Sequence, residues 1–129
     1  MNPRQAAAAR SLAAARCAWG ATCLACPERV VVTAGGEPDP RALWFARALG
    51  ARELAQGLTT LAAPGRRVLT AGVVVDGLHA VSVLVLATTD TPRRRPALLN
   101  ALAATCWALL GLALTRDRPS RYLRPATFR

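Results

Sequence analysis

The sequence predicts an all-α protein, a four-helix transmembrane bundle, and three observations lead to that prediction. The chain has 129 residues, 53% of them hydrophobic, and its apolar stretches alternate with short polar connectors. The stretch from Pro96 to Thr115 has no charged residue, and the stretch from Val68 to Thr89 has only Asp76 and His79 as acidic or basic residues. A helix of about 20 apolar residues is long enough to cross a hydrocarbon layer about 30 Å thick.

The position of the positive charge is the third observation. The formal net charge is +10, and all 17 basic residues are arginines. A nucleic-acid-binding protein would spread them along an exposed face. Here arginines cluster just outside the apolar stretches, at Arg66–Arg67, Arg93–Arg95 and Arg116–Arg118. The sequence therefore predicts a multi-pass protein of the cell membrane with no nucleic-acid partner.

The first predicted span covers about residues 6–26 and ends at Pro27. Arg10 and Arg16 lie within it, and arginines near the end of a span can extend their side chains to the lipid headgroups. A secretory signal peptide or a lipoprotein cleavage box ending at Cys26 is the alternative. Arg16 interrupts the apolar region, and Cys23 replaces the aliphatic residue expected in such a box, so both features favour a span.

Three further spans are predicted at about residues 43–63, 67–88 and 96–114. Pro64-Gly65 ends the second span, and Pro96 suits the first turn of the last helix. Glu28 to Pro40 is predicted to be a connector in which Val30–Val32 lies along the membrane interface. Residues 1–115 then form the transmembrane domain, and residues 116–129 form a basic C-terminal tail.

Four spans place both termini on the same side of the membrane. Of the arginines near the span ends and in the connectors and tail, nine fall on that side and five fall on the other. Cytoplasmic loops carry the excess of arginine and lysine, so both termini are predicted to be cytoplasmic. The arginine-rich loops and tail are expected to contact anionic lipids.

Four ionisable residues are predicted to share one depth near the middle of the second and third spans. Arg52 and Glu53 precede the turn at Pro64-Gly65, and Asp76 and His79 follow it at a similar separation. One unpaired charge at the bilayer centre costs about 2.5–3.5 kcal/mol. Pairing of Arg52 with Asp76, and of Glu53 with His79, would offset that cost. The cluster is either a structural ion pair or a polar site for a proton, an ion, a quinone-like headgroup or a small solute.

Small and polar residues recur at every third or fourth position of the last three spans. This spacing places them on one face of each helix, where small residues allow close helix packing in lipid. The predicted packing residues are Gly50, Gly57, Gly72, Asn100, Trp107 and Gly111.

Cys23 and Cys26 form a C-x-x-C pair at the end of the first span and are candidates for thiol redox chemistry. Membrane thiol oxidoreductases that pass electrons to quinone need a second, exposed cysteine pair. The two remaining cysteines, Cys17 and Cys106, are not in a predicted loop and so do not form such a pair. No His/Cys spacing matches a metal site, and no other motif predicts a catalytic residue.

Several of these elements together resemble the DoxX-like group of small four-helix membrane proteins. They are the short helix ending in Cys-Pro-Glu-Arg, the run from Phe45 to Leu58, the run from Ala71 to His79, and the last apolar helix. The most similar members are actinobacterial relatives of unknown function. Gly50-Ala-Arg-Glu-Leu54 and Val75-Asp76 are the most specific parts, and His79 stands where many members have a second acid. The resemblance implies an association with quinone-linked sulfur or thiol oxidation complexes.

The sequence as a whole favours a non-enzymatic integral membrane subunit or scaffold, an accessory component of a larger membrane complex. Its expected partners are other integral membrane proteins or a second copy of the chain, and no cofactor is expected for this role. One alternative is a thiol/quinone oxidoreductase that uses Cys23, Cys26 and quinone. Another is a carrier of a small solute or a proton that uses Arg52, Glu53, Asp76 and His79.

Overall fold

The computed structural model describes residues 1–116, and within that range it contains helices and no strand. Five of the helices are α-helical and one is a short 3-10 turn. Their bounds are α1 (Pro3–Ala25), α2 (Pro27–Thr33), α3 (Pro40–Ala62), α4 (Arg66–Thr89), η1 (Thr91–Arg93) and α5 (Arg94–Thr115).

Polar caps and prolines fix where the first helices begin. The Asn2 side chain accepts a hydrogen bond from the backbone N–H of Gln5 at 2.8 Å, and the Gln5 side chain accepts one from the backbone N–H of Asn2 at 2.9 Å. This capping box satisfies two donors that lack a partner within the helix. Asp39 caps α3 by accepting from the backbone N–H of Ala42 at 2.8 Å. Proline occupies the first turn of α1, α2 and α3, where no backbone N–H is needed.

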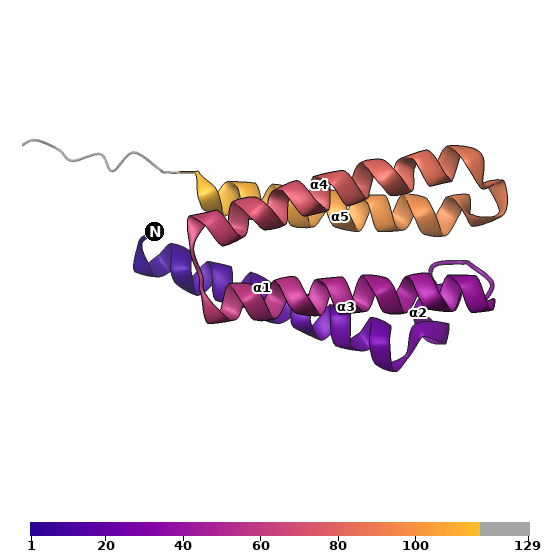
Figure 1. The fold of residues 1–129 in the computed structure, drawn as a ribbon, viewed down its shortest axis with the longest axis horizontal. Helices are drawn as coiled ribbons and strands as arrows, with labels where there is room; N and C mark the ends of the chain where they lie inside the picture. Colours follow the sequence, from indigo (N-terminus) through magenta and orange to yellow (C-terminus); the bar gives the residue numbers. More distant parts are fainter. Residues whose placement is uncertain (117–129) are drawn as a thin grey trace, which may run out of the picture.

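The four long helices form two antiparallel pairs that lie side by side (Figure 1). α1 packs along α3, with α2 at one end, and α4 packs along α5. Contacts between the two pairs are sparse, although α3 and α4 follow each other in the sequence. The sequence predicts α3 and α4 as packed neighbours, whereas in the structure their tight contacts are made with α1 and α5.

Small residues allow α1 and α3 to approach closely. A methyl group added at Gly50 would lie 2.7 Å from the carbonyl oxygen of Gly20, and one added at Gly57 would lie 2.8 Å from that of Ala13. The buried residues of both helices recur at alternating spacings of four and three, which keeps one face of each helix turned to the other. They are Ala9, Ala13, Arg16, Gly20 and Cys23 on α1, and Ala46, Gly50, Glu53, Gly57 and Thr60 on α3.

The second pair also packs through small residues. A methyl group added at Gly111 of α5 would lie 2.8 Å from Cγ2 of Val73 on α4. The buried residues of α5 are Ala97, Ala101, Ala104 and Gly111. The buried residues of α4 are Leu69, Asp76, Ala80 and Ala87.

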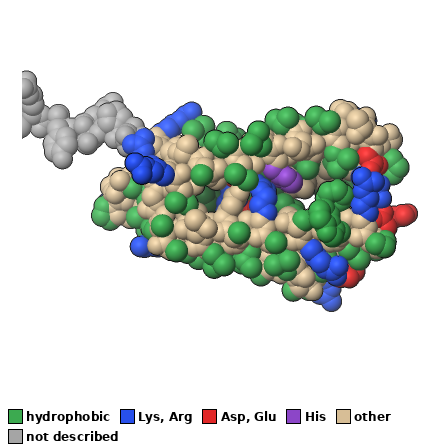
Figure 2. All heavy atoms as spheres, in the orientation of Figure 1, with side chains coloured by type: hydrophobic (Ala, Val, Ile, Leu, Met, Phe, Trp, Pro, Cys, Tyr) green, Lys and Arg blue, Asp and Glu red, His purple; other side chains and the backbone are tan. Residues whose placement is uncertain are grey.

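The outer surface is rich in large apolar side chains (Figure 2). Two helical stretches, Arg66–Thr89 and Thr91–Thr115, are long and apolar enough to cross a membrane, with mean hydropathies of 2.0 and 1.9. Within the most apolar 18-residue segment of each stretch, only 17% and 22% of the residues are buried inside the protein. α1 and α3 are also long, but they do not meet this test of length and composition, and both carry charged residues in their middle turns.

The connector predicted between residues 28 and 40 contains a helix that the sequence analysis did not predict. α2 occupies Pro27–Thr33, and Val31 is buried. The run of three valines disfavours a helix by propensity, but Pro27 starts the turn and burial of Val31 stabilises it. α1 and α3 each begin three residues earlier than the predicted spans, because a capping side chain and a proline start each helix there, and α5 begins two residues earlier. From residue 117 onward the predicted tail lies outside the described residues.

The two ends of the molecule are held by different contacts. At one end lie the N-terminus and the last described residue, where the Gln5 amide donates to the carbonyl oxygen of Arg116 at 3.5 Å (Figure 1). At the other end Arg93, on the second pair, donates to Asp39, on the first, at 2.5 Å. Beside this ion pair the Arg95 side chain covers Gly35, whose φ of +80° favours glycine.

Candidate functional site: a buried charge cluster between the helix pairs

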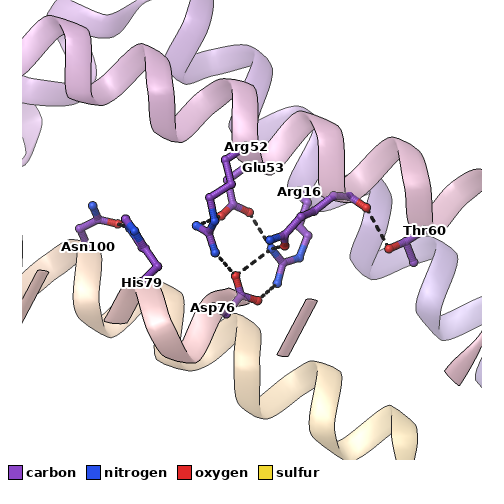
Figure 3. A network of polar contacts seen from close by, with 8 residues as sticks. Arg16, Arg52, Glu53, Thr60, Asp76, His79 and Asn100 are labelled. Atoms are coloured by element: carbon purple, nitrogen blue, oxygen red, sulfur yellow. Dashed lines mark hydrogen bonds and ion pairs between the residues drawn. The ribbon is translucent and has the colours of Figure 1, made fainter. Parts of the chain in front are cut away.

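The candidate site is a cluster of four charged side chains between the two helix pairs (Figure 3). Arg16 comes from α1, Arg52 and Glu53 from α3, and Asp76 from α4. The side chains of Glu53 and Asp76 are 1% and 0% exposed, and those of Arg16 and Arg52 are 6% and 19% exposed. We call these four residues the charge ring, because each arginine contacts both acids.

The geometry of the charge ring uses every carboxylate oxygen. Arg16 Nη1 donates to Glu53 Oε2 at 2.9 Å, and Arg52 Nη1 donates to Glu53 Oε1 at 2.9 Å. Asp76 accepts from both guanidinium groups, with Oδ2 facing Arg16 and Oδ1 facing Arg52. Two positive and two negative charges give the ring no net charge. Charge-assisted hydrogen bonds of this kind are about twice as strong as neutral ones.

Helix periodicity explains how adjacent residues of α3 reach different partners. Glu53 lies on the face with Gly50 and Gly57 that packs against α1, so its carboxylate meets Arg16. Arg52 is one residue earlier, about 100° around the helix, and its longer side chain reaches Asp76 on the other helix pair. The ring therefore links three helices.

The fourth long helix joins through an aromatic contact. The Arg16 guanidinium lies 4.8 Å from the centroid of the Trp107 ring on α5, a cation–π distance. Arg16 Nη1 also donates to the side-chain oxygen of Gln56 at 2.7 Å. One turn further along α3, the Thr60 hydroxyl donates to the backbone carbonyl of Gln56 at 2.9 Å (Figure 3). Arg16 is thus the residue that contacts the most elements of the site.

The predicted polar cluster is partly brought together. The structure pairs Arg52 with Asp76, as the sequence predicts. Glu53 contacts Arg16 and Arg52, and not His79. The Nε2 atom of His79 lies 3.3 Å from Oδ1 of Asn100 instead, within the α4–α5 pair. His79 is three residues beyond Asp76, and its ring turns toward α5 rather than α3.

Arg16 is the member of the site that the sequence analysis did not find. The sequence suggests that it extends to the lipid headgroups, but it is buried in the centre of the molecule. Two features of the sequence could have indicated this. Position 16 continues the spacing of Ala9, Ala13 and Gly20, and one arginine alone cannot neutralise both Glu53 and Asp76.

The predicted packing residues fall into three groups. Gly50, Gly57 and Gly111 lie at positions of close helix approach. Gly72 does not, because a methyl group added there would meet only Gln56 Oε1 at 3.9 Å. Asn100 and Trp107 act through polar contacts, with His79 and Arg16 respectively.

A cavity of about 160 Å³ adjoins the charge ring between the helix pairs. Leu12, Ala13 and Arg16 contribute from α1, and Trp107 and Gly111 contribute from α5. α3 and α4 supply the rest of its wall, which includes Gln56, Thr60, Leu69 and Gly72. The cavity is thus lined mainly by apolar groups, with Arg16 and Gln56 as its polar side.

The two redox candidates sit in unlike surroundings. Cys23 is fully buried where α1 meets Gly50, and Cys26 is half-buried at the break between α1 and α2. Both thiols are free, as are those of Cys17 and Cys106. Within residues 1–116, no three His, Cys, Asp or Glu side chains gather closely enough to hold a metal ion.

The charge ring can join helices more readily than it can catalyse proton transfer. A general base must accept a proton from a substrate within hydrogen-bond reach, and all four carboxylate oxygens already accept hydrogen bonds from arginine. Comparison of the chain with family models, curated proteins and solved structures gave no match.

Proposed function

We propose that this chain is an integral membrane protein that crosses the bilayer four times and serves as a non-enzymatic subunit or scaffold. The observation that carries the proposal is the distribution of polarity. The largest fully buried side chains are Glu53, Asp76 and Cys23, whereas Leu78, Leu102 and many other large apolar side chains are exposed. In water this arrangement would expose a large apolar surface to solvent. In a bilayer the same surface would contact lipid tails, which is favourable.

The charge ring supports the inclusion of α1 and α3 among the spans. Each of these helices has 23 residues and is about 34 Å long at a rise of 1.5 Å per residue. Their central charges, Arg16, Arg52 and Glu53, neutralise one another together with Asp76. Arg47 of α3 is exposed, and it lies near enough to the start of its helix to extend toward the headgroups.

The scaffold role is supported by the occupied carboxylates and by the exposed faces of α4 and α5. A ring whose acceptors are all engaged joins helices, and it leaves no free acid or base for a reaction. The apolar faces can contact the helices of another membrane protein or of a second copy of this chain. The resemblance to the DoxX-like group favours the same role. We also propose that both termini face the cytoplasm.

Membrane fractionation tests the proposal. The chain is expressed with a C-terminal tag, and the membrane pellet is washed at pH 11 with sodium carbonate and separately with 4 M urea, probe conditions that release peripheral proteins. We expect the chain to stay in the pellet and to dissolve only in detergent. Recovery of most of it in the supernatant without detergent would contradict the membrane proposal.

Purification in a mild detergent tests the subunit role. We expect the tagged chain to co-purify, at a fixed stoichiometry, with one or more integral membrane proteins or with an untagged copy of itself. A matched chain with Asp76→Ala should lose those partners if assembly needs the intact bundle. A wild-type chain that is monomeric and alone after crosslinking in the native membrane would contradict the role.

A further inference from the structure

The cavity beside the charge ring has one polar group that its own protein surroundings do not satisfy. Oε1 of Gln56 accepts a hydrogen bond from Arg16, but Nε2 of Gln56 is buried and has no partner among the described residues. A buried donor without a partner costs about 1–3 kcal/mol. Such a group in the wall of a cavity indicates that something else can occupy the cavity and accept from it.

The orientation of the Gln56 amide is fixed by its neighbour. A guanidinium group only donates hydrogen bonds, so the atom facing Arg16 must be the oxygen of Gln56. Turning the amide over would place two donors against each other and would lose the 2.7 Å contact. The unpartnered atom is therefore an N–H₂ group, and its missing partner must be an acceptor.

The charge balance around the cavity selects a neutral acceptor. Arg16, the one charged residue in the cavity wall, is neutralised within the charge ring by Glu53 and Asp76. An anion would receive no net attraction and would lose its hydration. The rest of the wall is mainly apolar, with Leu12, Val68, Leu69 and Val73 contributing side chains. A partner for this cavity must therefore be apolar apart from its acceptor atom.

We propose that the cavity binds a neutral apolar molecule with one carbonyl oxygen, which accepts a hydrogen bond from Nε2 of Gln56. Oε1 and Nε2 belong to one planar amide, and Nε2 is covered in the structure, so binding requires the whole Gln56 side chain to pivot about its contact with Arg16 until Nε2 faces the cavity. The volume of about 160 Å³ matches a group the size of one six-membered ring, since apolar cavities of about 150 Å³ bind benzene. The carbonyl can belong to a free small molecule or to the ester end of a neutral lipid.

The site has access from outside, because Thr59 and Ala71, which also line the cavity, are exposed. Thr59 belongs to α3 and Ala71 to α4. Neither residue belongs to the charge ring. The proposal goes beyond the scaffold role and does not depend on it.

The test uses two fluorinated probes of similar shape, 4-fluoroacetophenone with a carbonyl group and 1-ethyl-4-fluorobenzene without one. Purified full-length protein in detergent is titrated with each, and ¹⁹F NMR measures saturable binding relative to empty micelles. We expect the ketone to bind at one site about tenfold more tightly than the hydrocarbon, which is the size of one hydrogen bond of about 1.4 kcal/mol.

Three variants locate the site. Gln56→Leu should reduce ketone affinity to that of the hydrocarbon, and Gly72→Leu should abolish binding of both probes because its side chain fills the cavity. Gly77→Leu is the matched control on the same helix, since a Cβ there meets nothing within 4 Å, and it should bind as the wild type does. Circular dichroism melting confirms that each variant is folded.

Equal affinity of the wild type for both probes, or unchanged binding by Gly72→Leu, would overturn the proposal. The absence of saturable binding would overturn it as well, and would show that water or nothing fills the cavity. Competition then distinguishes the two sources of the carbonyl. Displacement of the bound ketone by monoolein, a neutral lipid ester, identifies a lipid ligand, and failure to displace it identifies a free small carbonyl compound.

Discussion

The stability of the charge ring depends on the balance between its two positive and two negative side chains. Each of its members would be costly to bury alone, at several kcal/mol even after local relaxation. Together, Arg16 and Arg52 place four N–H groups against the four oxygens of Glu53 and Asp76. Removing any one member leaves an uncompensated charge in surroundings that cannot hydrate it. The ring should therefore respond more strongly to single substitutions than to a balanced pair.

Asp76→Ala should destabilise the protein by about 3–5 kcal/mol, the cost of leaving one partner of a buried ion pair unpaired. Asp90→Ala is the matched control. Asp90 also contacts an arginine, Arg93 at 3.0 Å, but this pair lies at the end of the bundle and should contribute less than about 1 kcal/mol. Thermal or denaturant unfolding in detergent measures both effects.

The double variant Arg52→Ala/Asp76→Ala should recover part of the Asp76→Ala loss. It leaves Arg16 paired with Glu53, a balanced pair at 2.9 Å. With the single variant Arg52→Ala measured as well, the difference between the double-variant loss and the sum of the two single-variant losses is the coupling energy of a double-mutant cycle. Additive losses would mean that Arg52 and Asp76 do not interact, in contradiction to the structure.

Asp39 offers a residue-scale test of pH dependence outside the helical spans. The backbone N–H of Ala42, and then the Arg93 guanidinium, lower the pKa of Asp39 below its ordinary value. A depressed carboxylate pKa stabilises the fold above the unfolded-state value of about 3.9, and this contribution is lost as the pH falls through the folded-state pKa. The wild type should thus melt above Asp39→Asn at pH 7 and at pH 5. The difference should shrink toward zero at pH 3.

Asn at position 39 still caps α3 through its side-chain oxygen, so the comparison isolates the charge. The carboxylates of the charge ring titrate in both proteins and cancel in the difference. Melting curves recorded by circular dichroism at pH 7, 5 and 3 measure the difference in melting temperature between the wild type and Asp39→Asn. A difference that widened as the pH fell, or that vanished between pH 8 and pH 6, would show that Asp39 is not the responsible group.

At the scale of the helices, glycine positions decide how α1 and α3 meet. Gly50→Ala should destabilise the protein by about 1–3 kcal/mol, because its Cβ would lie 2.7 Å from a backbone oxygen that cannot move aside. Gly77→Ala adds the same methyl group to α4 in open space. There it should be neutral, or stabilising by up to about 1 kcal/mol from helix propensity. If the two variants melted alike, close approach at Gly50 would be refuted.

The break between α1 and α2 sets the reactivity of the cysteine pair. Cys26 lies outside the helix with φ and ψ of −133° and 53°, while Cys23 is 0% exposed against α3. In a variant that keeps only these two cysteines, N-ethylmaleimide should label Cys26 faster than Cys23. Diamide should protect neither thiol. Dissolving the protein in SDS should equalise the two rates, which is the control for intrinsic reactivity.

The opposite outcome would favour the thiol/quinone oxidoreductase. Protection by oxidant, its reversal by reductant, and renewed protection after addition of a quinone would show that Cys23 and Cys26 cycle as a redox pair. That result would require the end of α1 to unfold locally at Cys23, because the Cys23 side chain packs against Gly50 of α3 in the structure. Helix termini of this kind are where local opening costs least.

The sequence predicted the helical segments well, and their exact ends and neighbours less well. Proline and glycine punctuation locates the four long helices to within a few residues, since it marks where backbone hydrogen bonding must stop. The face carrying Ala46, Gly50, Glu53 and Gly57 was also predictable, and all four are buried. α2 was not, because its seven residues are too few for periodicity and its Pro-Glu-Arg-Val-Val-Val-Thr sequence favours a helix only after Val31 is buried.

At the scale of the whole molecule, the choice of helix pairs could not be deduced from the sequence. A short turn at residues 63–65 makes α3 and α4 neighbours in the chain, but every long helix has an apolar exterior, so periodicity alone does not say which faces meet. Matching glycines determine which helices pair: a methyl group added at either Gly20 or Gly50 would lie 2.7 Å from the backbone oxygen of the other. The pairs that result contact each other sparsely, and the charge ring and the Arg93–Asp39 contact lie at their junction.

This arrangement predicts that loss of the charge ring separates the pairs without unfolding them. Spin labels at exposed Leu58 on α3 and Leu109 on α5 report the distance between pairs, and labels at Leu78 and Leu109 report the distance within the second pair. In a background with the four native cysteines replaced by alanine, Asp76→Ala should broaden the first distance distribution and leave the second unchanged, as measured by double electron–electron resonance.

Helix content by circular dichroism should stay near the wild-type value, because each pair keeps its own small-residue interface. Arg52→Ala/Asp76→Ala should narrow the distribution between Leu58 and Leu109 again, since Arg16 and Glu53 remain balanced. If Asp76→Ala broadened both distributions equally, the bundle would be one cooperative unit, and the charge ring would stabilise the whole fold rather than the junction between its two halves.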